Sequence, residues 1–243
     1  MANPRAAMLV IGDEILSGRT RDANMHHLAG KLTEAGIDLK EVRVVPDDET
    51  AITDAVRALS SAFDHVFTSG GIGPTHDDIT ADCVARAMDA PIGIREDARA
   101  ILADHYERTG SELNEARLRM ARIPEGASLI ENPVSAAPGF SLGNVHVMAG
   151  VPSIFEAMVA SLLPRLIGGT PLLSETVRIE RPEGDIAARL GQIASEMSDL
   201  GFGSYPFISG GLYGSNIVIR GTSPERLAEA RARLEQALGD DAP

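Results

Sequence analysis

A glycine-rich segment with two adjacent carboxylates is the part of the sequence best suited to bind a phosphate. Residues 68–80 read Thr-Ser-Gly-Gly-Ile-Gly-Pro-Thr-His-Asp-Asp-Ile-Thr and join an expected strand to an expected helix. Glycines let backbone N–H groups approach a ligand closely, and a helix N-terminus adds oriented donors and partial positive charge. The residues expected to hold the ligand here are Gly70, Gly71, Gly73 and Thr75.

Two familiar phosphate-binding motifs do not fit this segment. A Walker loop needs a lysine after its last glycine, and the only lysines of the chain are Lys31 and Lys40. The dinucleotide fingerprint fails as well, because its final glycine position holds His76. A glycine-rich turn with Asp77 or Asp78 as an ordinary helix cap is the alternative interpretation. Adjacent carboxylates repel each other unless a metal ion, a substrate hydroxyl or an arginine lies between them, so both aspartates are candidate catalytic residues.

Two more junctions between a strand and a helix carry glycine and polar residues. Residues 12–18 read Gly-Asp-Glu-Ile-Leu-Ser-Gly after the first expected strand, and residues 149–153 read Ala-Gly-Val-Pro-Ser. Ligands of open parallel sheets bind outside the carboxyl ends of the strands, where the connections diverge. We therefore expect the first and third strands to flank a crevice, although Asp13 and Glu14 alone could simply cap a turn. The ligand-binding residues expected at these junctions are Gly12, Ser17, Asn24, Gly150 and Pro152.

Hydrophobic spacing predicts the elements that position these junctions. Strand and helix alternate three times, which is typical of a parallel sheet covered by helices on both faces. The expected strands are 6–11, 39–45 and 65–68, and the expected helices are 24–35, 48–62 and 78–88. Further helices are expected at 95–108, 112–122 and 152–166, with short strands at 128–130, 140–142 and 145–148.

Composition limits the class of protein. A net charge of −13 argues against nucleic acid as the main partner, because phosphate neutralisation needs clustered cations. No apolar run is long enough for a membrane span, and the single cysteine, Cys83, fits a reducing compartment, so we expect a cytoplasmic protein. The series Arg117, Arg119 and Arg122 is expected on a solvated helix, from which one arginine could reach a phosphate.

Four segments, taken in order, resemble the molybdopterin-binding domain family, which includes MogA and MoaB. They are Gly12–Gly18, Thr68–Thr80, Asn132-Pro133 with Pro138-Gly139-Phe140, and Gly150–Ser153. The nearest likeness is to the amino-terminal part of the CinA-type competence/damage-inducible proteins. The resemblance implies a doubly wound, mostly parallel α/β sheet over residues 1–167, which binds a phosphorylated pterin or nucleotide, with Gly139 among its ligand-binding residues.

The same resemblance implies roles for the acids. Asp78 matches a family aspartate linked to adenylyl chemistry, and Asp13, Glu14 and Asp47 match acidic positions near the site. These four residues are the expected ligands of a divalent metal, with Mg, Mn, Co and Ni as the candidates. Molybdopterin itself is a second candidate ligand.

The carboxyl-terminal part is expected to form a small α+β module over residues 170–243. Its Gly203–Pro206 segment, with Gly184–Ala187 ahead of it, is similar to the region that follows this domain in CinA-type proteins and in eukaryotic FAD synthases. No amidohydrolase domain of the CinA type is expected, so deamidation of nicotinamide mononucleotide is not implied. At Ala149 and at Ser135-Ala136 the sequence differs from the residues usual in the family. These differences bear on the identity of the ligand more than on its chemical class.

Two functions remain open from the sequence. The first is a metal-dependent pyrophosphatase for a nucleotide diphosphate such as ADP-ribose or FAD, favoured because carboxylates crowd the phosphate loops. The second is a molybdopterin-binding protein without turnover, or a factor of molybdenum cofactor biosynthesis. A phosphorylated small molecule is the expected partner in both cases, and we also expect a homo-oligomer.

Overall fold

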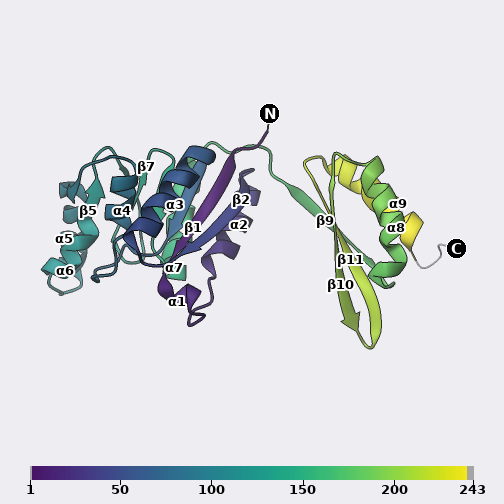
Figure 1. Ribbon diagram of the computed structural model, residues 1–243, viewed down its shortest axis with the longest axis horizontal. Coiled ribbons are helices and arrows are strands. Elements are labelled where there is room, and N and C mark those ends of the chain that lie inside the picture. Colours follow the sequence, from purple (N-terminus) through teal and green to yellow (C-terminus); the bar gives the residue numbers. More distant parts are fainter. Residues whose placement is uncertain (1, 240–243) are drawn as a thin grey trace. The chain divides into compact units, whose positions relative to one another are not determined.

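The computed structural model describes residues 2–239, and the chain divides after Gly169 into two compact units (Figure 1). Each unit has hydrophobic clusters of its own. No helix among the described residues combines the length and the apolar character that crossing a bilayer demands.

The first unit is built on a six-stranded sheet with the order β2-β1-β3-β8-β7-β6. Its strands are β1 (Arg5–Ile11), β2 (Asp38–Val45), β3 (His65–Ser69), β6 (Ser128–Ile130), β7 (Gly139–Leu142) and β8 (Val145–Met148). The four strands β2, β1, β3 and β8 run parallel, whereas β7 and β6 continue the sheet in antiparallel fashion. The doubly wound, mostly parallel sheet expected from the sequence is therefore confirmed.

Helices bury both faces of this sheet, which explains the unbroken apolar run in β1. Successive β1 side chains alternate, so that Ala7 and Leu9 pack toward one face and Ala6 and Met8 toward the other. The first face meets α3 (Glu49–Ala62), α4 (Thr80–Ala87) and α5 (Glu96–Arg108). The second face meets α2 (Asn24–Glu34) and α7 (Pro152–Leu162).

Short elements depart from the sequence expectations. The single helix expected over 112–122 is wrong: the structure has α6 (Glu115–Leu118), the 3₁₀ turn η1 (Arg119–Ala121) and β5 (Arg122–Pro124). The strand β5 pairs antiparallel with β4 (Ile92–Ile94), which the sequence analysis missed, as it missed α1 (Asp13–Leu16). Pro164 lacks an N–H, and α7 accordingly ends at Leu162 and passes into η2 (Leu163–Arg165).

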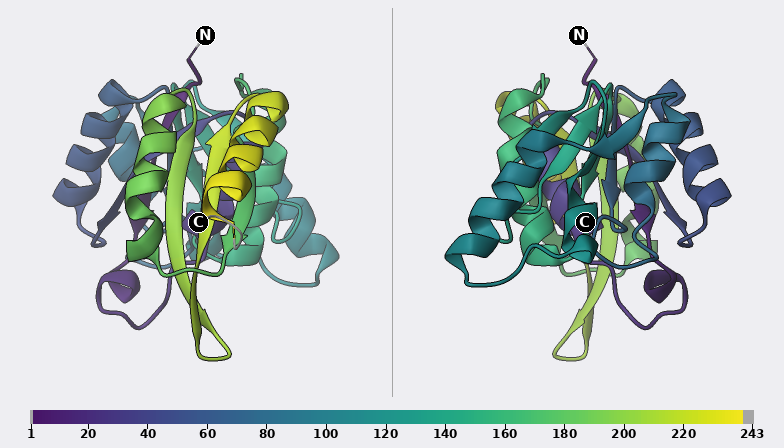
Figure 2. Two further views of the ribbon diagram at one scale, coloured as in Figure 1. Left: turned by 90° about the vertical axis from the view of Figure 1, so that its right-hand side faces the viewer. Right: turned by 90° about the vertical axis from the view of Figure 1, so that its left-hand side faces the viewer.

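The second unit is an antiparallel three-stranded sheet with two helices. Its elements are β9 (Leu173–Ile179), α8 (Glu183–Glu196), β10 (Gly201–Ser209), β11 (Leu212–Gly221) and α9 (Pro224–Leu238). The strand order is β10-β11-β9, and α8 and α9 lie side by side in front of the strands in the left view of Figure 2. Buried Ile186 and Leu227 from the helices pack against Val177 and Ile217 of the sheet. One face of this sheet is thus covered by helices.

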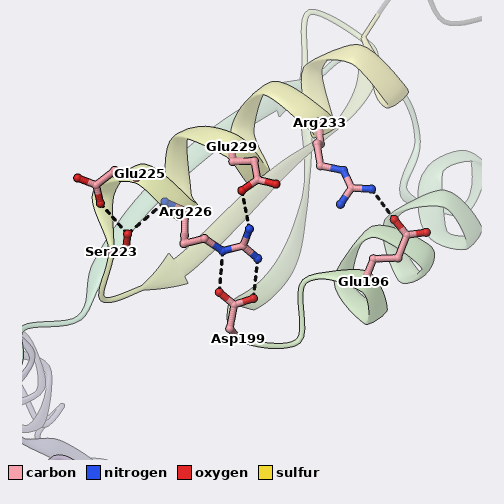
Figure 3. A network of polar contacts seen from close by, with 7 residues as sticks. All are labelled: Glu196, Asp199, Ser223, Glu225, Arg226, Glu229 and Arg233. Atoms are coloured by element: carbon pink, nitrogen blue, oxygen red, sulfur yellow. Dashed lines mark hydrogen bonds and ion pairs between the residues drawn. The ribbon is translucent and has the colours of Figure 1, made fainter.

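Ion pairs on the surface of the second unit join its helices to neighbouring segments (Figure 3). The Arg226 guanidinium binds both carboxylate oxygens of Asp199, at 2.9 and 2.7 Å, and also pairs with Glu229. Arg233 on α9 pairs with Glu196 at the end of α8. Exposed pairs of this kind contribute little stability individually, about 0–1 kcal/mol each. Each of these charged side chains is paired with another side chain of the second unit. The network therefore has a structural role.

Candidate functional site

The parallel strands place three glycine junctions along one edge of the sheet. From β1 the chain moves to β2 on one side and then to β3 on the other, so the connections diverge at β1 and β3. The expected adjacency of the first and third strands is confirmed by their parallel pairing. Gly12 follows β1, Gly70 follows β3 and Gly150 closely follows β8, which lies next to β3. An open α/β sheet binds its ligands at such a point.

A cavity of about 510 Å³ opens at this edge. That volume suits a small organic ligand, for which pockets of about 300–1,000 Å³ are usual. The strand-end loops provide most of the wall, and the segment from α5 to η1 provides Tyr106 and Met120. The lining residues are Ile11, Gly12, Glu14, Asp47, Gly70, Gly71, Ile72, Gly73, Pro74, Asp77, Asp78, Tyr106, Met120, Asn132, Ser135, Ala137, Ala149, Gly150, Val151 and Ile154.

The loop after β3 offers three consecutive backbone donors. The N–H of Gly70 is already used, because it donates to the Met148 carbonyl at 3.2 Å. Within residues 2–239, the N–H groups of Gly71, Ile72 and Gly73 have no hydrogen-bond acceptor. Successive free N–H groups after a parallel strand make an anion-binding concavity.

Glycine is required at position 71 of this loop for two reasons. Its φ of +67° is a left-handed conformation that side chains disfavour. A Cβ at Gly71 would also lie 2.1 Å from Oγ1 of Thr80, the first residue of α4. This Thr80 hydroxyl is buried and has no partner in the described chain. The glycine therefore shapes the loop itself, in addition to allowing close approach by a ligand.

Asp78 precedes the helix that it was expected to begin. The expected helix 78–88 is shorter at both ends, and α4 starts at Thr80. The physical reason is a turn: Asp78 Oδ2 accepts from the Thr75 N–H at 2.8 Å and from the Thr75 hydroxyl at 2.5 Å. The neighbouring Asp77 is exposed and also lines the cavity. Both candidate catalytic carboxylates thus lie at the cavity, and one of them also holds the loop in its conformation.

Glu14 and Asp47 bring two further carboxylates to the cavity wall. The Asp13 N–H donates to Asp47 Oδ2 at 3.0 Å and so fixes the loop after β2 to the loop after β1. Burial raises the pKa of Asp47, and the nearby carboxylates of Glu14, Asp13 and Asp77 raise it further, against the opposing effect of the Asp13 N–H. The cavity wall is therefore an acidic environment that favours a cation.

The carboxylates do not by themselves complete a metal site. No group of three or more His, Cys, Asp or Glu side chains in the described part of the chain is placed to hold a metal ion. Mg²⁺ is commonly held by one or two carboxylates together with substrate phosphates and water. Glu14 and Asp47 fit that smaller role, as residues that would hold a metal arriving with a phosphorylated ligand.

Six of the expected site residues lie outside the cavity lining. Asp13 and Ser17 line a separate shallow depression beside α1, and Thr75 bonds Asp78 as described. Gly139 begins β7, where a Cβ would lie 2.3 Å from the Val147 carbonyl oxygen, and Pro152 is the first residue of α7.

Asn24, the sixth of them, forms hydrogen bonds with two of the glycine junctions. Its Nδ2 donates to Ser69 Oγ at 2.8 Å and to the Gly150 carbonyl at 2.7 Å. Asn24 therefore fixes the loop after β3 to the loop after β8, a role that its position in the sequence alone did not indicate.

Several residues that line the cavity are not among those expected from the sequence. Tyr106 reaches it from α5, with the Arg117 guanidinium 4.5 Å from the centre of its ring. Asn132 shapes another wall, because its Oδ1 accepts from the N–H groups of Val134 and Ser135. Asn132 could have been chosen from its place in a motif shared with the family. Tyr106 gave no such signal, since it lies on an ordinary helix far from the glycine junctions in sequence.

The fold and site define an α/β protein with a cavity lined by glycine loops and carboxylates at the edge of the sheet where the strand connections diverge. Residues 7–168 match the family described as "probable molybdopterin binding domain", and the chain belongs to this family. Residues 171–242 match the family described as "FAD synthase, middle domain".

Individual relatives agree with these two matches. A protein of Archaeoglobus fulgidus is 33% identical over 96% of this chain and 97% of its own length. A "probable FAD synthase" of Caenorhabditis elegans is 31% identical over 96% of this chain, which spans 50% of that relative. A "CinA-like protein" of Citrifermentans bemidjiense is 39% identical over 68% of this chain and 41% of its own length.

Among solved structures, the chain is similar to the protein CinA, described as of unknown function, from Thermoplasma acidophilum. The TM-score is 0.62 and the identity 35%, over 68% of this chain and 99% of that one. The chain is thus a CinA-like member of the molybdopterin-binding domain family, and its relatives include proteins named FAD synthase.

Proposed function

We propose that this protein is a metal-dependent pyrophosphatase that hydrolyses a nucleotide diphosphate such as ADP-ribose or FAD. The observation that carries the proposal is the pairing of phosphate donors with carboxylates in one cavity. The free N–H groups of residues 71–73 and the side chains of Glu14, Asp47, Asp77 and Asp78 all line it. A site that only bound a pterin would need donors and a flat pocket, with less use for four acids.

Each part of the cavity has a role in this reaction. The backbone of residues 71–73 would hold one phosphate, and Glu14 and Asp47 are the residues that would hold a divalent ion together with the substrate phosphates. When bound, such an ion would supply Lewis acidity and would make a water molecule easier to deprotonate. Asp77 and Asp78 orient the attacking water and accept its proton. Water adds to one phosphorus and the bridging P–O bond breaks, so ADP-ribose gives AMP and ribose 5-phosphate.

The relatives support a nucleotide as the ligand. Proteins named FAD synthase match 96% of this chain, across both units, and FAD contains an adenosine diphosphate moiety. Molybdopterin binding without turnover is the second candidate, and the family description of residues 7–168 favours it.

The assay that separates the two candidates measures AMP release from ADP-ribose and from FAD, with magnesium, manganese, cobalt and nickel in turn. We expect release with at least one metal and none in the presence of a chelator. No release with any metal, together with tight binding of a pterin phosphate, would overturn the pyrophosphatase proposal in favour of the binding protein.

A further inference from the structure

Three arginines lie close together between residues 117 and 122, and the structure gives each a different environment. Arg117 stacks on Tyr106 and donates to the Glu112 carbonyl. Arg122 forms an ion pair with Asp82.

Arg119 has no carboxylate partner among the described residues. Its Nη2 makes one long hydrogen bond, 3.4 Å, to the Asp78 carbonyl oxygen. Among the described residues, Arg119 thus differs from Arg122 in having no carboxylate partner, and from Arg117 in making one long hydrogen bond and no ring contact.

The position of Arg119 is next to the phosphate loop. It lines a small hollow together with Gly71, Gly73 and Asp78, and these three residues also line the main cavity. The main cavity itself has acidic side chains but no arginine, lysine or histidine among its described lining residues. Both lysines of the chain lie elsewhere, Lys31 paired with Glu34 and Lys40 with Asp38. Arg119 is thus a cation beside the free loop donors, and its side chain has no anionic partner among the described residues.

A diphosphate carries more charge than three backbone donors neutralise. We propose that Arg119 binds the second phosphate of a nucleotide diphosphate, beside the phosphate held by residues 71–73, and so makes the site prefer diphosphates to monophosphates. This inference rests on the proposed function, because it takes a nucleotide diphosphate as the substrate. A guanidinium suits the role, since its planar fork forms paired, charge-assisted hydrogen bonds with phosphate oxygens. Arg119 is exposed and need only exchange one long bond to reach the ligand.

The test compares the affinities of ADP and AMP, measured by calorimetry with Mg²⁺ present, in wild type and three variants. Arg119→Gln should weaken ADP binding about tenfold or more, the loss expected for a charge-assisted hydrogen bond, while AMP binding changes little. Arg119→Lys should be intermediate, because an ammonium keeps the charge without the fork. Arg108→Gln is the matched control. It removes the same charge from the nearby end of α5, where Arg108 pairs with Asp104, and should bind both nucleotides as wild type does.

The outcomes distinguish a failure of the inference about Arg119 from a failure of the proposed pyrophosphatase function. If Arg119→Gln keeps the wild-type ratio of ADP to AMP affinity, the inference is overturned, even if ADP-ribose is hydrolysed. If wild type binds ADP but hydrolyses nothing, the pyrophosphatase proposal fails, and a lost preference for ADP in Arg119→Gln still supports Arg119. A wild-type protein that does not bind ADP overturns the inference about Arg119, and AMP release from ADP-ribose and FAD still decides the pyrophosphatase proposal. Thermal unfolding of every variant confirms that the protein used is folded.

Discussion

At the scale of single residues, substitution can separate the turn that Asp78 holds from the catalytic role proposed for its charge. Its Oδ2 accepts both hydrogen bonds from Thr75, and its charge lies at the wall of the cavity. Asp78→Asn keeps an oxygen that can accept from Thr75 but removes the charge. We expect turnover of ADP-ribose to fall about a hundredfold or more, the scale of losing one key electrostatic group.

The comparison variant is Thr75→Val, which removes one hydrogen bond to Asp78 and leaves the carboxylate charged. It should lose far less activity than Asp78→Asn in the same assay. Equal losses in kcat/KM would mean that Asp78 acts by holding the turn, and the catalytic role would have to pass to Asp77.

At the scale of elements, a partly buried chain of hydrogen-bonded side chains crosses three neighbouring strands of the sheet. His65 Nδ1 on β3 lies 3.2 Å from His146 Nε2 on β8, and His146 Nδ1 lies 2.8 Å from Ser141 Oγ on β7. Burial lowers the pKa of His146 to about 3, with smaller contributions from His65 and Arg165. The structure therefore keeps this histidine neutral at the pH at which an exposed histidine becomes charged.

This depressed pKa predicts how stability depends on pH. In the unfolded chain His146 titrates with a pKa of about 6.5. Between that pH and about 3, His146 therefore binds a proton in the unfolded state but not in the folded state. The free energy of unfolding should consequently fall as pH decreases below about 6.5, by up to about 1.4 kcal/mol per pH unit. His146→Gln should flatten this slope, measured by urea unfolding from pH 7 to pH 4. His26→Gln, at an exposed position on α2, should not; identical slopes in both variants would contradict the prediction.

The elements that the sequence predicted well are those whose periodicity extends over several residues. The continuous apolar run of β1 predicts a strand buried on both faces, and the spaced apolar residues of α3 predict a helix buried on one face. Both elements appear as expected. A three-residue strand such as β4 or β5 is too short to show a hydrophobic period. It is defined by its pairing with a strand that is distant in sequence. The same limit applies to Tyr106, which lies in the segment between β4 and β5, whereas Arg119 was expected only as one of three arginines that could reach a phosphate.

At the scale of the whole molecule, each unit forms its hydrophobic core from its own residues. The clusters around β1 and β3 contain only residues of the first unit, and the cluster of the second unit contains only residues from β9 onward. All residues lining the main cavity also come from the first unit. The expected homo-oligomer stays a prediction, which light scattering of the full chain would check.

This organisation predicts the behaviour of a shortened chain. A fragment that ends at Gly169 keeps the Gly169 N–H bonded to the Gly36 carbonyl at 3.0 Å, and the cut falls where the chain divides into its two compact units. We expect the fragment to fold cooperatively and to bind ADP within about threefold of the full chain, because no cavity residue is removed and a threefold change is only about 0.7 kcal/mol. Circular dichroism and calorimetry on the same preparation check both points. A fragment that is folded yet binds ADP far more weakly would show that the second unit contributes directly to the ligand site.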